Sequence, residues 1–137
     1  MLRVRSLLLS LNIFFLLLPL NVDAALPMND GERQRYDVQI DVRGAYISGV
    51  CMMLNDGGLI KATVVNEFGV TAISYTYDPV SGRVRLVSVM DMLDKWYIRR
   101  VLRRDLRHVM DGLRQDISTY ENTKRKIRYQ FIVLYSS

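Results

Sequence analysis

Apolar and polar residues alternate along the chain after residue 35, and this pattern predicts an antiparallel β-meander. In residues 36–43 every second side chain is apolar, which is typical of a strand with one buried and one solvent-facing side. The run Asn55-Asp56-Gly57-Gly58 indicates a hairpin turn, because these residues tolerate positive φ angles. Four further strands are expected over residues 45–54, 59–66, 70–77 and 83–89.

The spacing of apolar residues changes to that of a helix after Met90. It predicts an amphipathic helix over residues 94–115, whose start Asp91 or Asp94 can cap. The apolar stripe consists of Ile98, Val101, Leu102, Leu106, Val109, Met110 and Leu113. The opposite face carries Arg99, Arg100, Arg103, Arg104 and Arg107.

The end of the chain returns to a strand pattern after a polar link over residues 116–125. The closing strand is predicted from the alternating residues Ile127, Tyr129, Phe131, Val133 and Tyr135. Together these elements predict an α+β fold, with a strongly curved antiparallel sheet of about six strands that forms an incomplete barrel. One long amphipathic helix should pack across one face of this sheet, before the last strand.

The N-terminal residues have the order of an export signal. Arg3 and Arg5 precede an apolar run over residues 6–18, followed by Pro19 and the small-residue end Val22-Asp23-Ala24. This run is shorter than the roughly 20 residues that a membrane-spanning helix needs. We therefore expect a signal peptide over residues 1–24, with an uncleaved anchor as the alternative. The protein should then be exported and soluble, in the periplasm or secreted, with a flexible leader over residues 25–35 and a single domain over 36–137.

The composition excludes several classes of exported protein. Cys51 is the single cysteine, so the chain has no internal disulfide and no cysteine at the expected cleavage site for lipid attachment. Cys51 lies in an apolar segment, which favours a buried structural thiol over a reactive one. The formal net charge is +5 at pH 7, and it falls to +4 without residues 1–24, so the mature protein is mildly basic.

Residues that could carry catalysis are few. His108 is the single histidine, and it lies among arginines on the predicted helix without a carboxylate partner in the sequence. Glu67, Asp91 and Asp94 could form a carboxylate cluster, but each also fits a turn or a helix cap. The sequence has no serine-elbow motif, no phosphate-binding glycine loop and no spaced cysteine and histidine set. We expect a protein that is not an enzyme and has no metal or cofactor.

The arginine face of the helix has two interpretations. It can be a solvated charged surface, or Arg99, Arg103 and Arg107 can contact the anionic surface of a membrane. A second basic cluster, formed by Lys124, Arg125, Lys126 and Arg128, could take part in the same contact. Nucleic acid is not an expected partner of an exported protein.

The aromatic and methionine residues also have two interpretations, because they can form a core or line a ligand cavity between sheet and helix. The cavity candidates are Met52, Tyr75, Tyr77, Met90, Trp96, Tyr97, Tyr129 and Phe131. A void that opens to solvent would favour a carrier of an apolar ligand. A filled interior would favour an interaction module.

Residues 60–78, the following Gly82-Arg83-Val84 and the later helix resemble the middle of the periplasmic lipoprotein-localisation carriers and their outer-membrane receptors. In that superfamily a strand reaches a phenylalanine and glycine turn and returns through an apolar strand to a tyrosine and aspartate turn. The resemblance covers residues 45–110. It implies an incomplete β-barrel whose concave apolar face, covered by helix, holds acyl chains. This chain is shorter than those carriers and has no lipid-bearing cysteine like that of the receptor.

These observations lead to two hypotheses about function. The first is a non-enzymatic exported protein that binds an apolar ligand, such as a lipid or a lipoprotein acyl chain. The second is a structural or protein-interaction module of the cell envelope that has no small ligand. It would use the final strand or the arginine face to meet a protein partner.

Overall fold

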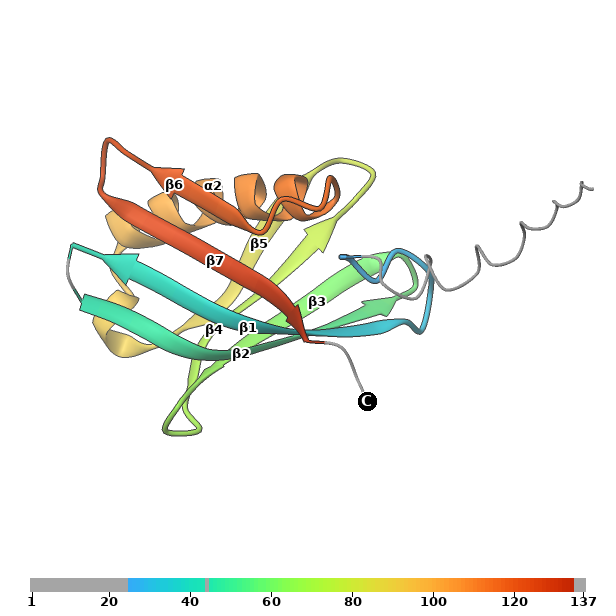
Figure 1. The fold of residues 1–137 in the computed structure, drawn as a ribbon, viewed down its shortest axis with the longest axis horizontal. Coiled ribbons are helices and arrows are strands. Elements are labelled where there is room, and N and C mark those ends of the chain that lie inside the picture. Colours follow the sequence, from blue (N-terminus) through green and yellow to red (C-terminus); the bar gives the residue numbers. More distant parts are fainter. Residues whose placement is uncertain (1–24, 44, 135–137) are drawn as a thin grey trace, which may run out of the picture.

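The computed structural model describes residues 25–43 and 45–134, and its described part is a seven-stranded antiparallel sheet with one long helix (Figure 1). The predicted signal peptide and Tyr135 lie outside the described residues. The elements are β1 Arg33–Val42, β2 Ala45–Asp56, β3 Leu59–Asn66, β4 Thr71–Asp78, β5 Arg83–Val89, η1 Asp91–Leu93, α2 Trp96–Leu113, β6 Thr119–Asn122 and β7 Ile127–Leu134.

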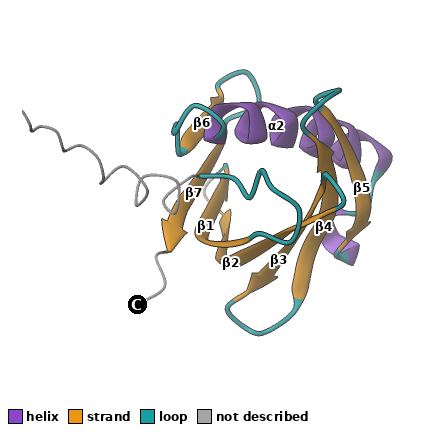
Figure 2. Ribbon diagram, turned by 90° about the vertical axis from the view of Figure 1, so that its right-hand side faces the viewer, coloured by secondary structure: helices purple, strands orange, loops and turns teal. Residues whose placement is uncertain are grey.

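The strands follow the order β5-β4-β3-β2-β1-β7-β6 in one curled sheet, so β1 lies in the sheet between β2 and β7. Figure 2 shows the sheet as a half-barrel, with α2 across its mouth between the two edge strands β5 and β6. This arrangement confirms the predicted α+β class, the curved antiparallel sheet and the helix before the last strands. The sheet has one strand more than expected, because the polar link contains β6. Three of its four residues are polar, so the sequence pattern does not indicate a strand there, and they join the sheet by pairing with β7.

Two irregularities in strand pairing help to curl the sheet. The register shifts between Val64 and Val65 in β3 and between Ser74 and Tyr75 in β4, and such bulges bend a strand and increase its twist. Gly49 in β2 lies close to the first of these bulges. A Cβ atom at Gly49 would lie 1.9 Å from the carbonyl oxygen of Val65, so the two backbones can approach this closely only at a residue without a side chain.

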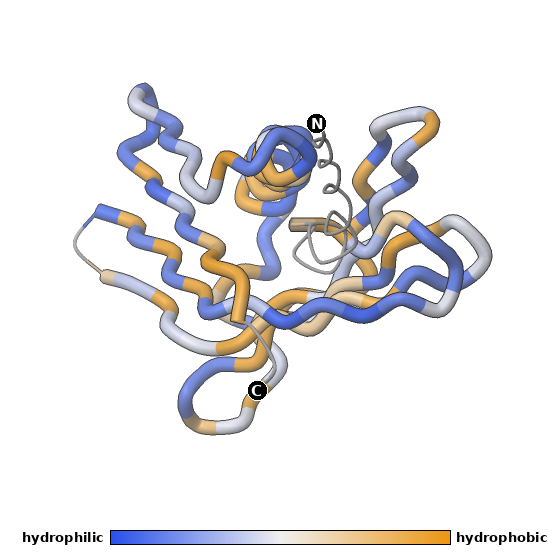
Figure 3. Tube along the Cα trace, turned by 45° about the vertical axis from the view of Figure 1, so that its right-hand side comes forward, coloured by the Kyte–Doolittle hydropathy of each residue, from blue (hydrophilic) through white to orange (hydrophobic). Residues whose placement is uncertain are grey.

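The core lies between the concave face of the sheet and α2. Alternate strand residues point inward, as the pattern predicts, and they include Tyr36, Val38 and Ile40 of β1. The helix buries most of the predicted stripe, and Figure 3 shows its hydrophilic side turned away from the sheet. Its buried apolar residues are Leu102, Leu106, Val109, Met110 and Leu113.

The start of the helix differs from the prediction. Lys95 is the N-cap of α2, and it makes no capping hydrogen bond through its side chain. Asp91 begins the short helix η1 instead, and Asp94 forms an ion pair with Arg99 at 3.0 Å. The proposed capping role of these two aspartates is therefore wrong, because the extra turn of η1 displaces them from the cap position.

The expectation of a flexible leader over residues 25–35 is also wrong. Ala25 and Leu26 are buried in the core, and β1 begins at Arg33 rather than near Tyr36. Asn55 ties this segment down, because its side-chain amide donates to the carbonyl of Pro27 at 2.8 Å and its backbone exchanges hydrogen bonds with Gly31 and Glu32. The segment therefore covers one end of the half-barrel, near the β2–β3 turn (Figure 2).

Candidate functional site

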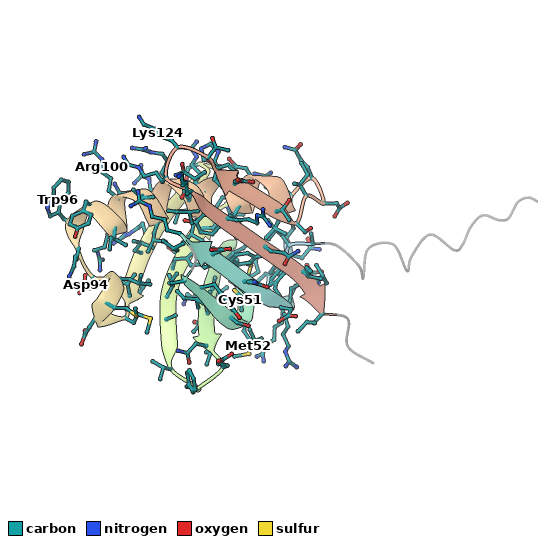
Figure 4. All side chains as sticks on the ribbon, turned by 60° about the vertical axis from the view of Figure 1, so that its left-hand side comes forward. Cys51, Met52, Asp94, Trp96, Arg100 and Lys124 are labelled. Carbon is teal, nitrogen blue, oxygen red and sulfur yellow. The ribbon has the colours of Figure 1, made fainter. Side chains whose placement is uncertain are left out.

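The structure separates the eight predicted cavity residues into three places. Four of them belong to the buried core, namely Tyr75, Tyr77, Tyr129 and Phe131. Met52 is 52% exposed and points to the opposite side of β2 from its buried neighbours Cys51 and Met53. Trp96 and Tyr97 are exposed at the start of α2, and Met90 is half-buried just before η1. Figure 4 shows Met52 far from Trp96, so the eight residues do not line one cavity.

The buried tyrosines bind the sheet to the helix through their hydroxyl groups. Tyr75 donates to the sulfur of Met110 at 3.4 Å, and Tyr77 donates to Asp111 at 2.9 Å. Burial raises the pKa of Tyr75 well above its ordinary value. These contacts show that the aromatic residues fill the space between sheet and helix.

The carboxylate of Asp105, which was not predicted as a site residue, also connects the helix to the sheet. Asp105 is fully buried in α2 and accepts a hydrogen bond from the Tyr129 hydroxyl at 2.8 Å. The side-chain amide of Asn122 donates to both carboxylate oxygens, at 3.0 and 3.1 Å. The signal that could have found Asp105 is its position, because it lies on the apolar stripe between Leu102 and Val109.

The end of the half-barrel opposite the N-terminal segment is hollowed. A groove of about 680 Å³, here called the terminal groove, lies where the start of α2 meets the end of β1 and the start of β7. Its apolar lining is Val42, Leu93, Ile98, Val101, Leu102 and Ile127. Trp96 is 73% exposed and Tyr97 is 51% exposed, and both lie along this groove. Four arginines line it as well, namely Arg43, Arg100, Arg104 and Arg125.

A second hollow adjoins the terminal groove. It encloses about 410 Å³ and shares Val42 and Leu93 with the terminal groove. Met90 lines this hollow, and so does Phe68, which is 80% exposed in the turn between β3 and β4. The two hollows together present apolar side chains to solvent at one end of the molecule, and such surfaces mark binding sites.

The arginine side chains of α2 line another depression, here called the arginine groove. It encloses about 500 Å³ beside the β4–β5 turn, and Arg83 of β5 lines it together with Arg100, Arg103, Arg104 and Arg107 of α2. Arg100 and Arg104 line both this groove and the terminal groove. Two of the predicted membrane-contact residues, Arg103 and Arg107, therefore line the same groove.

The third predicted membrane-contact residue, Arg99, does not line this groove and pairs with Asp94 instead. The second basic cluster is also divided. Arg125 lines the terminal groove, whereas Arg128 lies 4.0 Å from Glu121 on the last two strands. The predicted basic residues thus do not all line the arginine groove.

The single histidine and the single cysteine both pack against other parts of the protein. His108 stacks on Tyr120, with ring centroids 4.9 Å apart. Cys51 is buried, and burial raises the pKa of its thiol far above the ordinary value of 9.0, which disfavours the thiolate form. Within residues 25–43 and 45–134, no three histidine, cysteine, aspartate or glutamate side chains gather closely enough to hold a metal ion. No helix in this part of the chain has the length and apolar character needed to cross a membrane.

Comparison with known proteins finds no matching family model, curated protein or solved structure. The resemblance to lipoprotein-localisation carriers therefore stays a prediction.

Proposed function

We propose that this protein is a non-enzymatic exported binding protein that holds an apolar ligand, such as the acyl chain of a lipid, in the terminal groove. The observation that carries the proposal is an apolar groove of about 680 Å³ at the uncovered end of the half-barrel, with exposed aromatic residues along it. Its volume lies within the range of about 300–1,000 Å³ that is typical of small-molecule sites.

The proposed site differs from the one expected from sequence. Buried aromatic side chains, with Tyr75 and Phe131 among them, occupy the space between sheet and helix. The ligand would instead lie at the end of the half-barrel, against Val42, Ile98 and Val101. Of the predicted cavity residues, Trp96 and Tyr97 line this site, and Met90 lines the adjoining hollow.

Trp96 provides a direct test, because it is the only tryptophan of the chain and lies along the groove. We expect its fluorescence to shift to shorter wavelength, in a saturable manner, when the purified exported protein is titrated with monomeric oleate. Val101→Glu should weaken this binding, since it places a charge in the apolar lining.

The matched control for this variant is Met52→Glu, which introduces the same charge at an exposed apolar residue outside the groove. It should bind oleate as the unaltered protein does. An unchanged emission spectrum in the unaltered protein, or equal binding by both variants, would remove the terminal groove as a ligand site.

A protein-interaction module is the second candidate, and the filled space between sheet and helix favours it. Native mass spectrometry of the purified exported protein separates the two candidates. A bound lipid mass supports the ligand-binding protein, whereas a stoichiometric partner chain without lipid supports the interaction module.

Export is part of the first proposal and depends on the signal-like order of residues 1–24. We expect N-terminal sequencing of protein recovered from outside the cytoplasm to begin at or near Ala25. An intact Met1 in that pool would contradict cleavage.

A further inference from the structure

The arginine groove concentrates positive charge on one side of α2. Its five arginines come from two elements, because Arg83 belongs to β5 and the other four belong to the helix. Within the helix, Arg100 and Arg104 are four residues apart, as are Arg103 and Arg107, and like charges at this spacing repel each other. An anion bound between them would relieve this repulsion.

Neighbouring carboxylates balance little of this charge. Arg107 has Asp111 at 4.0 Å, and Asp111 also accepts the hydrogen bond from Tyr77. Among the residues that the structure describes, no ion pair involves the other four arginines of the groove. The groove is therefore a strongly cationic depression.

One arginine side chain of the groove lies close to the backbone of the β4–β5 turn. Gly82 lies in this turn, and a Cβ atom there would be 3.3 Å from Nη2 of Arg107. The guanidinium of Arg107 thus lies against the turn beside Arg83, rather than extending away from the protein. Guanidinium groups bind phosphate oxygens through paired hydrogen bonds, which makes them well suited to a phosphate group.

The position of the arginine groove connects it to the proposed ligand site. Arg100 and Arg104 line both depressions, so one molecule can contact both. Figure 4 shows Arg100 and Trp96 projecting from the same end of the molecule. An acyl chain in the terminal groove would place its polar end beside these two arginines.

We propose that the ligand is a lipid with a phosphate-monoester headgroup, whose phosphate binds in the arginine groove while its acyl chain lies in the terminal groove. This inference rests on the proposed function and names the chemical class of its ligand. Charge complementarity selects this occupant, because a phosphate monoester carries close to two negative charges at neutral pH, whereas a zwitterionic headgroup has no net charge.

The test compares two short-chain lipids that differ only in their headgroup. Dioctanoyl phosphatidic acid and dioctanoyl phosphatidylcholine are titrated below their critical micelle concentrations, and the emission of Trp96 reports binding. We expect phosphatidic acid to bind at least about tenfold more tightly, which corresponds to one added charge-assisted hydrogen bond. Combining Arg83→Gln, Arg103→Gln and Arg107→Gln should reduce this preference to less than about threefold, because these side chains then lack the charge that favours phosphate.

A control variant separates a specific site from net charge. Arg33→Gln, Arg35→Gln and Lys61→Gln together remove the same number of positive charges from exposed positions in β1 and β3. This variant should retain the preference for phosphatidic acid. Inorganic phosphate alone should not displace the bound lipid at equal concentration, because it lacks the acyl chain.

The outcomes distinguish the two proposals. If neither lipid binds, the proposed function fails, and the inference fails with it. If both lipids bind equally, or if the control variant loses the preference as fully as the groove variant, the inference alone is overturned. Displacement by inorganic phosphate alone would likewise overturn it, since the groove would then be a site for free phosphate.

Discussion

Asp105 shows how a single charged residue can connect three elements of this fold. Its carboxylate lies in the core side of α2 and accepts hydrogen bonds from β6 and β7. We expect Asp105→Ala to lower the free energy of unfolding by about 1–3 kcal/mol, because it leaves the buried Tyr129 hydroxyl without an acceptor. Urea denaturation measures this change.

The double variant Asp105→Ala with Tyr129→Phe tests the reason for this loss. Removing both partners should recover part of the stability, since no buried hydroxyl is then left unpaired. Asp37→Ala, at an exposed position in β1, should change the stability little. A loss equally small in Asp105→Ala would contradict the role given to this carboxylate.

Gly49 is the second residue whose role follows from one close contact. An alanine there would place its Cβ against the backbone of Val65, so β2 and β3 would have to separate at the bulge. We expect Gly49→Ala to lower the free energy of unfolding by about 1–3 kcal/mol, as overpacking does in other cores. Thermal unfolding followed by circular dichroism measures it. Ser48→Ala, at the neighbouring position, should have a clearly smaller effect. Equal melting temperatures for both variants would show that the sheet adapts freely at Gly49.

Residues 25–32 act as a structural element although they form no helix or strand. Leu26 is 2% exposed and fills the end of the half-barrel. We expect Leu26→Ala to cost about 2–5 kcal/mol, because it opens a cavity in the core. Met28→Ala, two residues further along and exposed to solvent, is the matched control and should cost much less. Equal urea midpoints for these two variants would mean that the segment adds nothing to the core.

The closing strand β7 joins the sheet beside β1, and Phe131 is one of its buried side chains. Phe131 is fully buried and packs edge-on against Tyr36, with ring centroids 6.1 Å apart. We expect Phe131→Ala to cost about 3–5 kcal/mol in a urea titration. Its neighbour Ile132 faces solvent, so Ile132→Ala should cost far less. A loss below about 1 kcal/mol for Phe131→Ala would be incompatible with this packing.

The whole molecule should lose stability at alkaline pH. Burial raises the pKa of the Cys51 thiol and of the hydroxyls of Tyr36, Tyr75 and Tyr129 above their ordinary values of 9.0 and 10.0. Below pH 9 these groups are protonated in both folded and unfolded chains, so their contribution to stability is fully present. Above pH 9–10 the unfolded chain releases their protons while the folded chain retains them, so stability falls as the pH rises.

Each of these groups should lower the free energy of unfolding by at most about 1.4 kcal/mol per pH unit in this range. Urea titrations at pH 8, 10 and 11 measure the slope. Tyr75→Phe should make the slope shallower, because it removes one group that ionises in the unfolded chain. A constant stability between pH 8 and 11 would show that these groups ionise as readily in the folded protein.

The two ends of the half-barrel differ, and this difference is visible only in the whole molecule. One end is covered by residues 25–32, which bind the β2–β3 turn through Asn55 and Asp30. The other end holds the terminal groove and its adjoining hollow. Residues 25–32 have no clear sequence pattern, yet the end that they leave uncovered is the one that holds the proposed binding site.

Local periodicity determined much of this protein by itself. The alternation in residues 36–43 and the helical stripe from Ile98 to Leu113 identify elements whose apolar faces must be buried, so they also indicate a curved sheet with a helix across it. These patterns are strong because each depends on neighbouring residues. They identified the core tyrosines and Phe131 as apolar positions, although not whether these residues form a core or a cavity.

Tertiary structure decided which of these residues are buried and which lie together, because both depend on contacts between residues far apart in the chain. Met52 lies in a strand that is apolar on both faces, so only the observed pairing shows that it points away from the core. Asp105 and Leu26 are buried because partners from distant segments satisfy or surround them. Arg83 joins the arginines of α2 because β5, an edge strand of the curled sheet, lies beside the helix, and the local patterns do not say which strand does so.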